Sequence, residues 1–273
     1  MLPKSSAPPG GRVAASASEG DAVAVRGVRV SHGGAPLLDG LDVVFAAHRT
    51  TCILGASGVG KSTLLRLIAG LPPGPERGSA RDGVGRSLEG RLAYMAQDDL
   101  LLPWASVASN VTLGSRLRGE PIDSARAAAL IEAVGLAAYA DALPRTLSGG
   151  MRQRAALART LMEERPIVLM DEPFSALDAL TRHQLQDLVA ELFRGRTIIL
   201  VTHDPIEALR LGHAVHVMAN QPAQLDEPLI VGGEPTRDPT SPEIVALQRE
   251  LMAKLDVGRL AGMPDAPRLA AHG

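Results

Sequence analysis

A nine-residue segment near the N-terminus combines the residue types that bind phosphate. It fits the pattern G-x-x-x-x-G-K-[ST], lies between an apolar run at 51–54 and a helical pattern at 64–69, and consists of Gly55, Ala56, Ser57, Gly58, Val59, Gly60, Lys61, Ser62 and Thr63. The glycines allow backbone N–H groups to surround an anion, and the following helix adds the positive end of its dipole. Lys61 can reach the β- and γ-phosphates, and the Ser62 hydroxyl can bind Mg²⁺. The segment predicts a nucleotide site; the alternative is a glycine-rich turn before a helix.

Two adjacent carboxylates end a second apolar run, at 167–170. Asp171 is placed to hold Mg²⁺, directly or through water. Glu172 can then orient a water molecule for attack on the γ-phosphate. The alternative is a capped strand end with two solvated acids, which the phosphate-binding segment makes the weaker interpretation.

A third segment, Leu-Ser-Gly-Gly-Met-Arg-Gln-Arg at 147–154, predicts another helix that begins at an anion. Ser148 has the residue type of an N-cap, and Gly149 and Gly150 leave backbone N–H groups uncovered. Such a helix end attracts negative charge without a lysine. One chain therefore carries two helix ends suited to phosphate.

The elements that position these segments alternate along the chain, which predicts an α/β fold with a mostly parallel sheet. Short apolar runs predict strands at 22–30, 37–45, 50–54, 91–96, 167–170, 197–201 and 214–218. Periodic segments predict helices at 124–134, 149–164, 182–193 and 241–255. The helical block at about 98–165 interrupts the alternation and predicts an inserted subdomain. The Gly/Pro/Arg-rich stretch at 72–90 is expected to hold a short edge element.

Composition narrows the class of protein. The chain has 273 residues, 45% of them hydrophobic but only 2% aromatic, and a net charge of −2, so no basic surface predicts nucleic acid as a partner. Cys52 is the only cysteine, which excludes an internal disulfide and favours a reducing compartment. No apolar run approaches the roughly 18 residues of a membrane-spanning helix. Residues 1–21 lack the apolar core of a secretion signal and are expected to be a disordered tail.

Taken together, the motifs resemble those of the nucleotide-binding subunit of an ATP-binding cassette (ABC) transporter. The resemblance covers about 22–220, with the motifs in the family's order: the phosphate loop, Gln97, the signature at 147–154, the carboxylates at 169–173, the segment Ser-Ala-Leu-Asp at 175–178, and His203. It implies a P-loop NTPase core, an N-terminal antiparallel β subdomain and the inserted α-helical subdomain. Residues 221–273 are then a linker and a short helix without a regulatory domain.

The resemblance also implies that each ATP site is built from two copies of the chain. In that family, the signature serine and glycines of one subunit cap the γ-phosphate of the ATP that the other subunit's phosphate loop holds. Carried over, Ser148, Gly149 and Gly150 act across a head-to-tail homodimer, and Asp178 links its two sites. Closure would exclude water and supply the dipole that one subunit lacks.

Three further positions take their roles from the same resemblance. His203 is assigned to the γ-phosphate and the attacking water, and Gln97 to Mg²⁺, water and the membrane partner. The family usually stacks an aromatic residue on adenine, whereas this chain offers His32 at the corresponding distance before the phosphate loop. An imidazole can still stack, with a smaller π-face, which predicts a weaker preference for the base.

The segment at 100–104 bears on the expected protein partner and on the transported solute. Leu-Leu-Leu-Pro-Trp at 100–104 is either a core anchor or a docking groove for a helix of an integral-membrane permease. It resembles importers of the nitrate/sulfonate/taurine and thiamine-precursor group, and overall similarity points to the hydroxymethylpyrimidine type. The expected protein hydrolyses ATP with Mg²⁺ at the cytoplasmic face of the inner membrane, peripherally through the permease, which a solute-binding protein serves.

Two other function classes stay open at this stage. A soluble cassette ATPase of iron–sulfur assembly or DNA repair commonly has long insertions or a second cassette, and neither is present. A P-loop kinase or GTPase lacks the signature sequence at 147–154. Both alternatives are therefore weaker than a transport ATPase.

Overall fold

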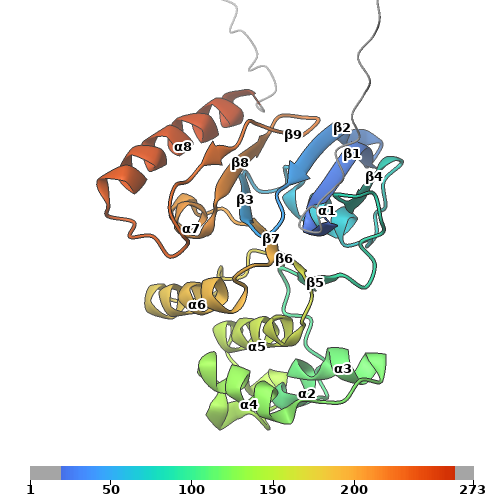
Figure 1. Ribbon diagram of the computed structural model, residues 1–273, viewed down its shortest axis with the longest axis vertical. Coiled ribbons are helices and arrows are strands. Elements are labelled where there is room, and N and C mark those ends of the chain that lie inside the picture. The colour runs from blue at the N-terminus through green and yellow to red at the C-terminus, as the bar shows by residue number, and fades with distance from the viewer. Residues whose placement is uncertain (1–19, 262–273) are drawn as a thin grey trace, which may run out of the picture.

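The computed structural model describes residues 20–261 of the chain (Figure 1). In chain order, its elements are β1 (Val23–His32), β2 (Ala35–Phe45), β3 (Thr50–Gly55), α1 (Lys61–Ile68), β4 (Arg77–Asp82), β5 (Leu92–Met95), α2 (Val107–Val111), α3 (Leu113–Arg118), α4 (Ser124–Ala133), α5 (Gly149–Met162), β6 (Ile167–Asp171), α6 (Ala179–Leu192), β7 (Thr197–Val201), α7 (Pro205–Leu211), β8 (Ala214–Ala219), β9 (Gln224–Leu225), β10 (Leu229–Ile230) and α8 (Pro242–Ala261).

A sheet with a parallel centre positions the predicted nucleotide residues. Its strands lie in the order β10-β8-β3-β7-β6-β5, with neighbours from β8 to β5 parallel and the short β9 and β10 antiparallel to β8. The chain leaves β3 for the far edge at β5 and returns to β3 through β6 and β7. In such open sheets, ligands bind beyond the carboxyl ends of the strands. Those ends carry the phosphate loop, Asp171 and His203.

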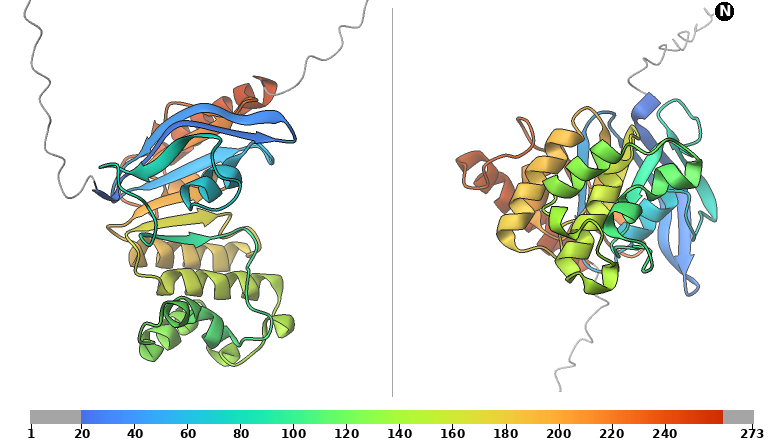
Figure 2. Two further views of the ribbon diagram at one scale, coloured as in Figure 1. Left: turned by 90° about the vertical axis from the view of Figure 1, so that its right-hand side faces the viewer. Right: turned by 90° about the horizontal axis from the view of Figure 1, so that it is seen from below.

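Both faces of this sheet are covered, which explains why its strands are apolar along their whole length. In β6, Ile167 and Leu169 pack with α1 and with the antiparallel sheet β2-β1-β4. Val168 and Met170, which point the other way, pack with α5, α6, α7 and α8. Figure 2 shows the resulting layers edge-on. The predicted α/β fold class with its N-terminal antiparallel subdomain is confirmed.

The helices α2, α3, α4 and α5 form a block at one end of the molecule, away from α8 and the antiparallel sheet (Figure 1). All four lie inside 98–165, where the sequence predicts the inserted helical subdomain. The helix α5 connects the helical block to the parallel sheet, because its buried residues belong to the same core cluster as β6 and α4. Within residues 20–261, no helix is long and apolar enough to cross a membrane.

Some boundaries differ from those that the sequence predicts. The helix α6 starts three residues earlier, because Asp178 rather than Arg182 marks its beginning, and α7 is an additional helix that begins at Pro205. Asp21, predicted to belong to the tail, instead pairs with Arg91, with Oδ1 and Nη2 2.7 Å apart. The helix α8 continues to Ala261. The rest of the two predicted disordered termini, 1–19 and 262–273, lies outside the described residues.

Candidate nucleotide-binding site

The phosphate loop connects β3 to α1, as predicted. Gly60 caps α1 without a side-chain hydrogen bond, so no side chain covers the first N–H groups of that helix. Glycine is required at Gly55, because a Cβ atom there would lie 2.3 Å from the backbone oxygen of Met218 in β8. At Gly58 the requirement is a left-handed φ of 79°. The local sequence therefore builds a loop whose exposed N–H groups suit an anion.

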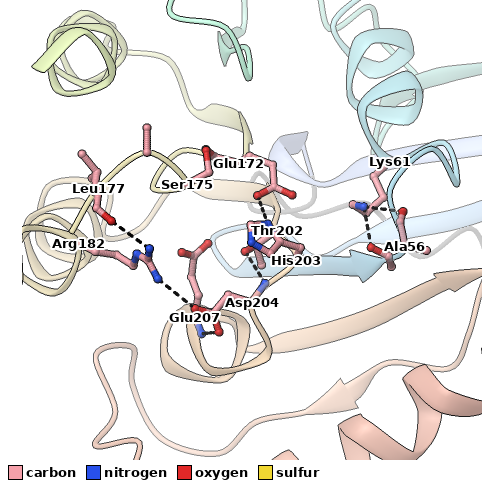
Figure 3. A network of polar contacts seen from close by, with 12 residues as sticks. Ala56, Lys61, Glu172, Ser175, Leu177, Arg182, Thr202, His203, Asp204 and Glu207 are labelled. Atoms are coloured by element: carbon pink, nitrogen blue, oxygen red, sulfur yellow. Dashed lines mark hydrogen bonds and ion pairs between the residues drawn. The ribbon is translucent and has the colours of Figure 1, made fainter. Parts of the chain in front are cut away.

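Lys61 is directed back across this loop. Its Nζ donates to the carbonyl oxygens of Gly55 at 2.7 Å and Ala56 at 2.9 Å (Figure 3). Burial lowers the pKa of Lys61, and the nearby carboxylates of Glu172 and Asp171 oppose this shift. Lys61 is only 7% exposed and its ammonium group rests on carbonyl oxygens, so a phosphate beside it would supply a full counter-charge.

Asp171 lies at the end of β6, next to the phosphate loop, and fits a role in holding a cation. It is 2% exposed, and its Oδ1 is buried without a hydrogen-bond partner among the residues that the structure describes. Burial raises the pKa of Asp171, and a hydrogen bond from the Ser62 hydroxyl opposes that rise. A carboxylate and a hydroxyl supply the hard oxygen atoms that Mg²⁺ prefers. The residues present therefore fit Mg²⁺.

Gln97 follows β5 after one intervening residue and is exposed. Because β5 pairs in parallel with β6, with Met95 opposite Met170, Gln97 comes off the same edge of the sheet as Asp171. The structure thus brings the three proposed magnesium residues to one edge.

Glu172 and His203 are in direct contact, which the sequence did not reveal. Glu172 Oε2 lies 2.5 Å from His203 Nδ1 and accepts a hydrogen bond from the Nδ1–H group (Figure 3). The Glu172 side chain is 13% exposed, whereas that of His203 is 65% exposed. The contact fixes the imidazole and leaves its Nε2 free to meet a ligand.

The backbone of Glu172 is held in an unfavourable conformation, with φ at +53°. Its N–H donates to Val201 O at 2.9 Å, and its carbonyl accepts from Gln153 Nε2 at 2.9 Å and from Ser175 Oγ at 3.0 Å. Backbone strain of about 1–3 kcal/mol persists only where surrounding contacts maintain it. Sequence reasoning missed the contribution of Gln153 and Ser175; the position of Gln153 inside the signature was the available signal.

The signature segment faces solvent at the start of α5. Ser148 caps that helix by accepting a hydrogen bond from Met151 N at 3.2 Å, as predicted. Ser148 and Gly149 are exposed, and a Cβ on Gly149 would meet no atom of residues 20–261 closer than 4.0 Å. Packing within the chain therefore does not explain Gly149. At Gly150 a Cβ would be 3.1 Å from Ala176 O, so there the fold itself favours glycine.

Asp178 and His32 occupy two other exposed positions. Asp178 caps α6, accepting from Thr181 N at 3.0 Å, and this hydrogen bond lowers the pKa of Asp178. His32 ends β1 in the hairpin with β2. The same hairpin places Leu37 against the phosphate loop, 3.4 Å from where a Cβ on Gly60 would lie. His32 thus belongs to the hairpin that contacts the phosphate loop.

Trp104 is 75% exposed and Leu100 is 63% exposed, so Trp104 is not a core anchor, whereas Leu101 of the same segment is buried. The backbone beside them is fastened to α5. Arg159 donates to the carbonyl oxygens of Asp99 at 2.7 Å and Leu100 at 2.8 Å, and Arg152 donates to Asp99 Oδ2 at 3.0 Å. An exposed aromatic side chain on a rigid support suits a protein contact.

Behind His203 lies a buried acid, Glu207, that sequence reasoning missed. Burial raises the pKa of Glu207 to about 7, and a hydrogen bond from Thr202 opposes the rise. Gln186 Nε2 donates to Glu207 Oε2 at 3.2 Å, while Oε1 is buried without a partner. The signal in the sequence was a glutamate one turn after His203.

This acid predicts a pH-dependent stability. Because the folded-state pKa of Glu207 is above its usual value of 4.5, its protonation stabilises the fold below about pH 4.5, and this contribution is lost as the pH rises through about 7. Glu207→Gln imitates the protonated acid. We expect the variant to exceed the parent by up to about 3 kcal/mol at alkaline pH and to lose this advantage in acid.

Urea unfolding of both proteins at pH 5.5 and pH 8.5 would measure this difference. Glu191→Gln, a change at an exposed glutamate of α6, is the control. An advantage of Glu207→Gln that is equal at the two pH values would contradict the assignment.

These features define a class of protein. A parallel sheet with a phosphate loop at its centre, a buried acid beside the loop serine and an adjacent carboxylate make a P-loop nucleotide-hydrolysing domain. The signature helix on an inserted helical block distinguishes this domain from kinases and GTPases.

Comparison with known proteins gives the family. The ABC transporter family profile matches residues 38–175. An aliphatic sulfonates import ATP-binding protein of Pseudomonas syringae pv. syringae is 41% identical over 233 residues, covering 84% of this chain and 94% of the relative. One of Burkholderia lata with the same function in its name is 42% identical over 252 residues, covering 90% of each chain. The dimeric cassette MJ0796 with ADP and Pi superimposes with a TM-score of 0.69 at 27% identity, covering 77% of this chain and 99% of MJ0796. The chain belongs to the ABC transporter family and is an ATPase coupled to transport.

Proposed function

We propose that the chain is the ATP-hydrolysing subunit of an importer and works as a head-to-tail homodimer. The observation that supports this most is the exposed signature: Gly149 is a glycine that its own chain does not require. The helices α1 and α5, each with an end suited to phosphate, pack on opposite faces of the sheet. This arrangement favours a site in which the two ends that serve one phosphate group belong to different copies.

In this proposal, the N–H groups of Gly55–Thr63 bind the triphosphate, and Lys61 supplies the charge. His32 stacks on adenine. Ser62, Asp171 and Gln97 would hold Mg²⁺, which would neutralise part of the phosphate charge. The copy that faces this site contributes Ser148, Gly149 and Gly150, whose N–H groups surround the γ-phosphate, and Asp178 lies between the two sites.

The geometry of the dyad supports a proposed catalytic step. Glu172 Oε2 accepts a hydrogen bond from His203 Nδ1, which fixes the imidazole and leaves Nε2 available to the γ-phosphate. The second oxygen of Glu172 is then free to polarise a water molecule for in-line attack. Positioning and charge stabilisation contribute most to phosphoryl transfer, so the strained backbone of Glu172 acts by fixing this carboxylate.

The solute is a small molecule, and an aliphatic sulfonate is the best-supported kind. The two import relatives described above carry sulfonate import in their names. The hydroxymethylpyrimidine type that overall similarity suggested has no comparable support among these relatives. Nitrate or taurine transport is the neighbouring alternative, and a soluble cassette ATPase is the alternative of another class.

We propose that residues 22–220 form the nucleotide-binding domain, with the helical subdomain at 98–165, and that 221–273 add a linker and a helix. The exposed surface at Leu100 and Trp104 receives a helix of the permease, which receives the solute from its solute-binding protein. The chain then lies at the cytoplasmic face of the inner membrane, bound through the permease. No nucleic acid takes part.

Co-expression with the adjacent membrane subunits tests this function. We expect the chain to co-purify with a polytopic membrane protein, and the complex in vesicles to take up an aliphatic sulfonate when Mg-ATP is supplied. Trp104→Ala should lower the recovery of the permease at least tenfold if Trp104 is a hot spot worth about 2 kcal/mol. Leu117→Ala, a change at another exposed apolar residue of the helical block, is the control. Recovery of no membrane protein by the parent chain would count against the transport role.

A further inference from the structure

Two loops carry the catalytic dyad, and they leave neighbouring strands. One follows β6, contains Glu172 and reaches Asp178, where α6 begins. The other follows β7, contains His203 and reaches Asp204, where α7 begins. The loops are joined at the strand ends by the Glu172 N–H to Val201 carbonyl bond, and again by the contact between Glu172 and His203.

A third connection lies farther out, at Arg182 on the first turn of α6. Its Nη2 donates to Leu177 O at 3.0 Å, and its Nη1 lies 3.5 Å from Asp204 Oδ2 (Figure 3). The side chain is 33% exposed, and its Nε is buried with no hydrogen-bond partner in the described part of the chain. A guanidinium group can contact two acceptors at once because its donors form a rigid fork. Arg182 therefore spans the two loops just beyond the dyad.

Both acceptors of Arg182 are rigidly connected to a catalytic residue. Leu177 N donates to Phe174 O, and Ser175 N donates to Glu172 O, so tight turns join Leu177 to Glu172. On the other loop, Asp204 N donates to Thr202 Oγ1 at 3.1 Å, directly around His203. The contacts form a closed ring through Glu172, Leu177, Arg182, Asp204 and His203.

We propose that Arg182 is a positioning residue that couples Asp178 to the catalytic dyad. Leu177, whose carbonyl Arg182 binds, immediately precedes Asp178, and under the proposed function Asp178 lies between the two sites of the dimer. A displacement of this segment on dimer closure is passed through Arg182 to Asp204, and so to His203. This inference rests on the proposed function, because a protomer that works alone undergoes no dimer closure for Arg182 to transmit.

Steady-state ATP hydrolysis by Arg182→Gln tests the inference. We expect kcat to fall about tenfold or more, because a misplaced catalytic group lowers the rate. KM for ATP should change less than about threefold, because the Arg182 side chain hydrogen-bonds to Leu177 and Asp204 and not to the phosphate loop. Arg182→Lys should recover only part of kcat, since an ammonium lacks the fork. Arg194→Gln, at an exposed arginine without an ion pair in residues 20–261, is the control and should match the parent.

A double-mutant cycle with Asp204→Asn separates positioning from a general effect on folding. Asn keeps the cap that Asp204 provides to Ile206 N, and it removes the charge that faces Arg182. If Arg182 acts through Asp204, the double variant loses little more kcat than Arg182→Gln alone. Additive losses, or a kcat for Arg182→Gln within twofold of the parent, would overturn the inference. A parent that does not hydrolyse ATP at all would overturn the proposed function instead.

Discussion

Replacing Glu172 with glutamine should lower ATP turnover by a factor of about 10²–10⁴, the usual contribution of a positioned general base. The change keeps the size of the side chain and an oxygen that can accept from His203 Nδ1, so the contact now measured at 2.5 Å can persist. What the amide cannot do is polarise the attacking water. ATP binding should therefore be retained, and the closed dimer should accumulate.

Two measurements check this prediction together. Single-turnover hydrolysis reports the chemical step, and sedimentation with saturating Mg-ATP reports the dimer. The matched control is Glu164→Gln. The Glu164 carboxylate is 70% exposed and lies just beyond the C-terminal end of α5, whereas the signature is at the N-terminal end. Normal turnover in Glu172→Gln, or a variant that stays monomeric with ATP, would contradict the role of this carboxylate.

The second large effect is expected at the signature. Ser148→Arg places a long side chain where Ser148 and Gly149 now face solvent, and it removes the cap on α5. We expect hydrolysis to fall by a factor of about 10²–10³, the cost of losing preorganised donors at the developing charge. Binding of ATP to a single protomer should be unaffected, because Lys61 and the phosphate loop are intact.

Mixing two inactive variants distinguishes a shared site from a site within one chain. Lys61→Ala removes the phosphate-loop cation, and Ser148→Arg blocks the signature. In a head-to-tail dimer of one copy of each, one composite site contains neither change. Equal amounts of the two variants should then recover roughly a quarter of the parent activity, as expected for random pairing and independent sites. If Ser148→Arg alone turned over ATP like the parent, the trans role of the signature would be wrong.

The parts of the site that the sequence predicts are those fixed by local chemistry. The phosphate loop, the capping of α5 by Ser148 and the carboxylates after β6 depend on a few consecutive residues, and all are found where expected. The fold class follows from the alternation of strands and helices. A short helix such as α7, with proline at its first position, has too few residues to produce a clear period.

The parts that the sequence missed depend on residues far apart in the chain. The contact of Glu172 with His203 requires β6 and β7 to be neighbours, a pairing that no local pattern specifies. The contacts of Gln153 and Arg182 depend in the same way on how α5 and α6 pack beside the strand ends. For Trp104, residue type is compatible with both a core and a surface position, and only the structure shows the second.

The two arginines that fasten residues 99–100 to α5 have a mechanical consequence. The backbone next to Trp104 cannot stay in place while α5 tilts, because Arg159 holds two of its carbonyl groups and Arg152 holds Asp99. A rotation of α5 that brings Ser148 toward the opposite protomer must therefore also move the exposed Trp104. Closure of the dimer on ATP would therefore move Trp104 and transmit force to the membrane protein that Trp104 contacts.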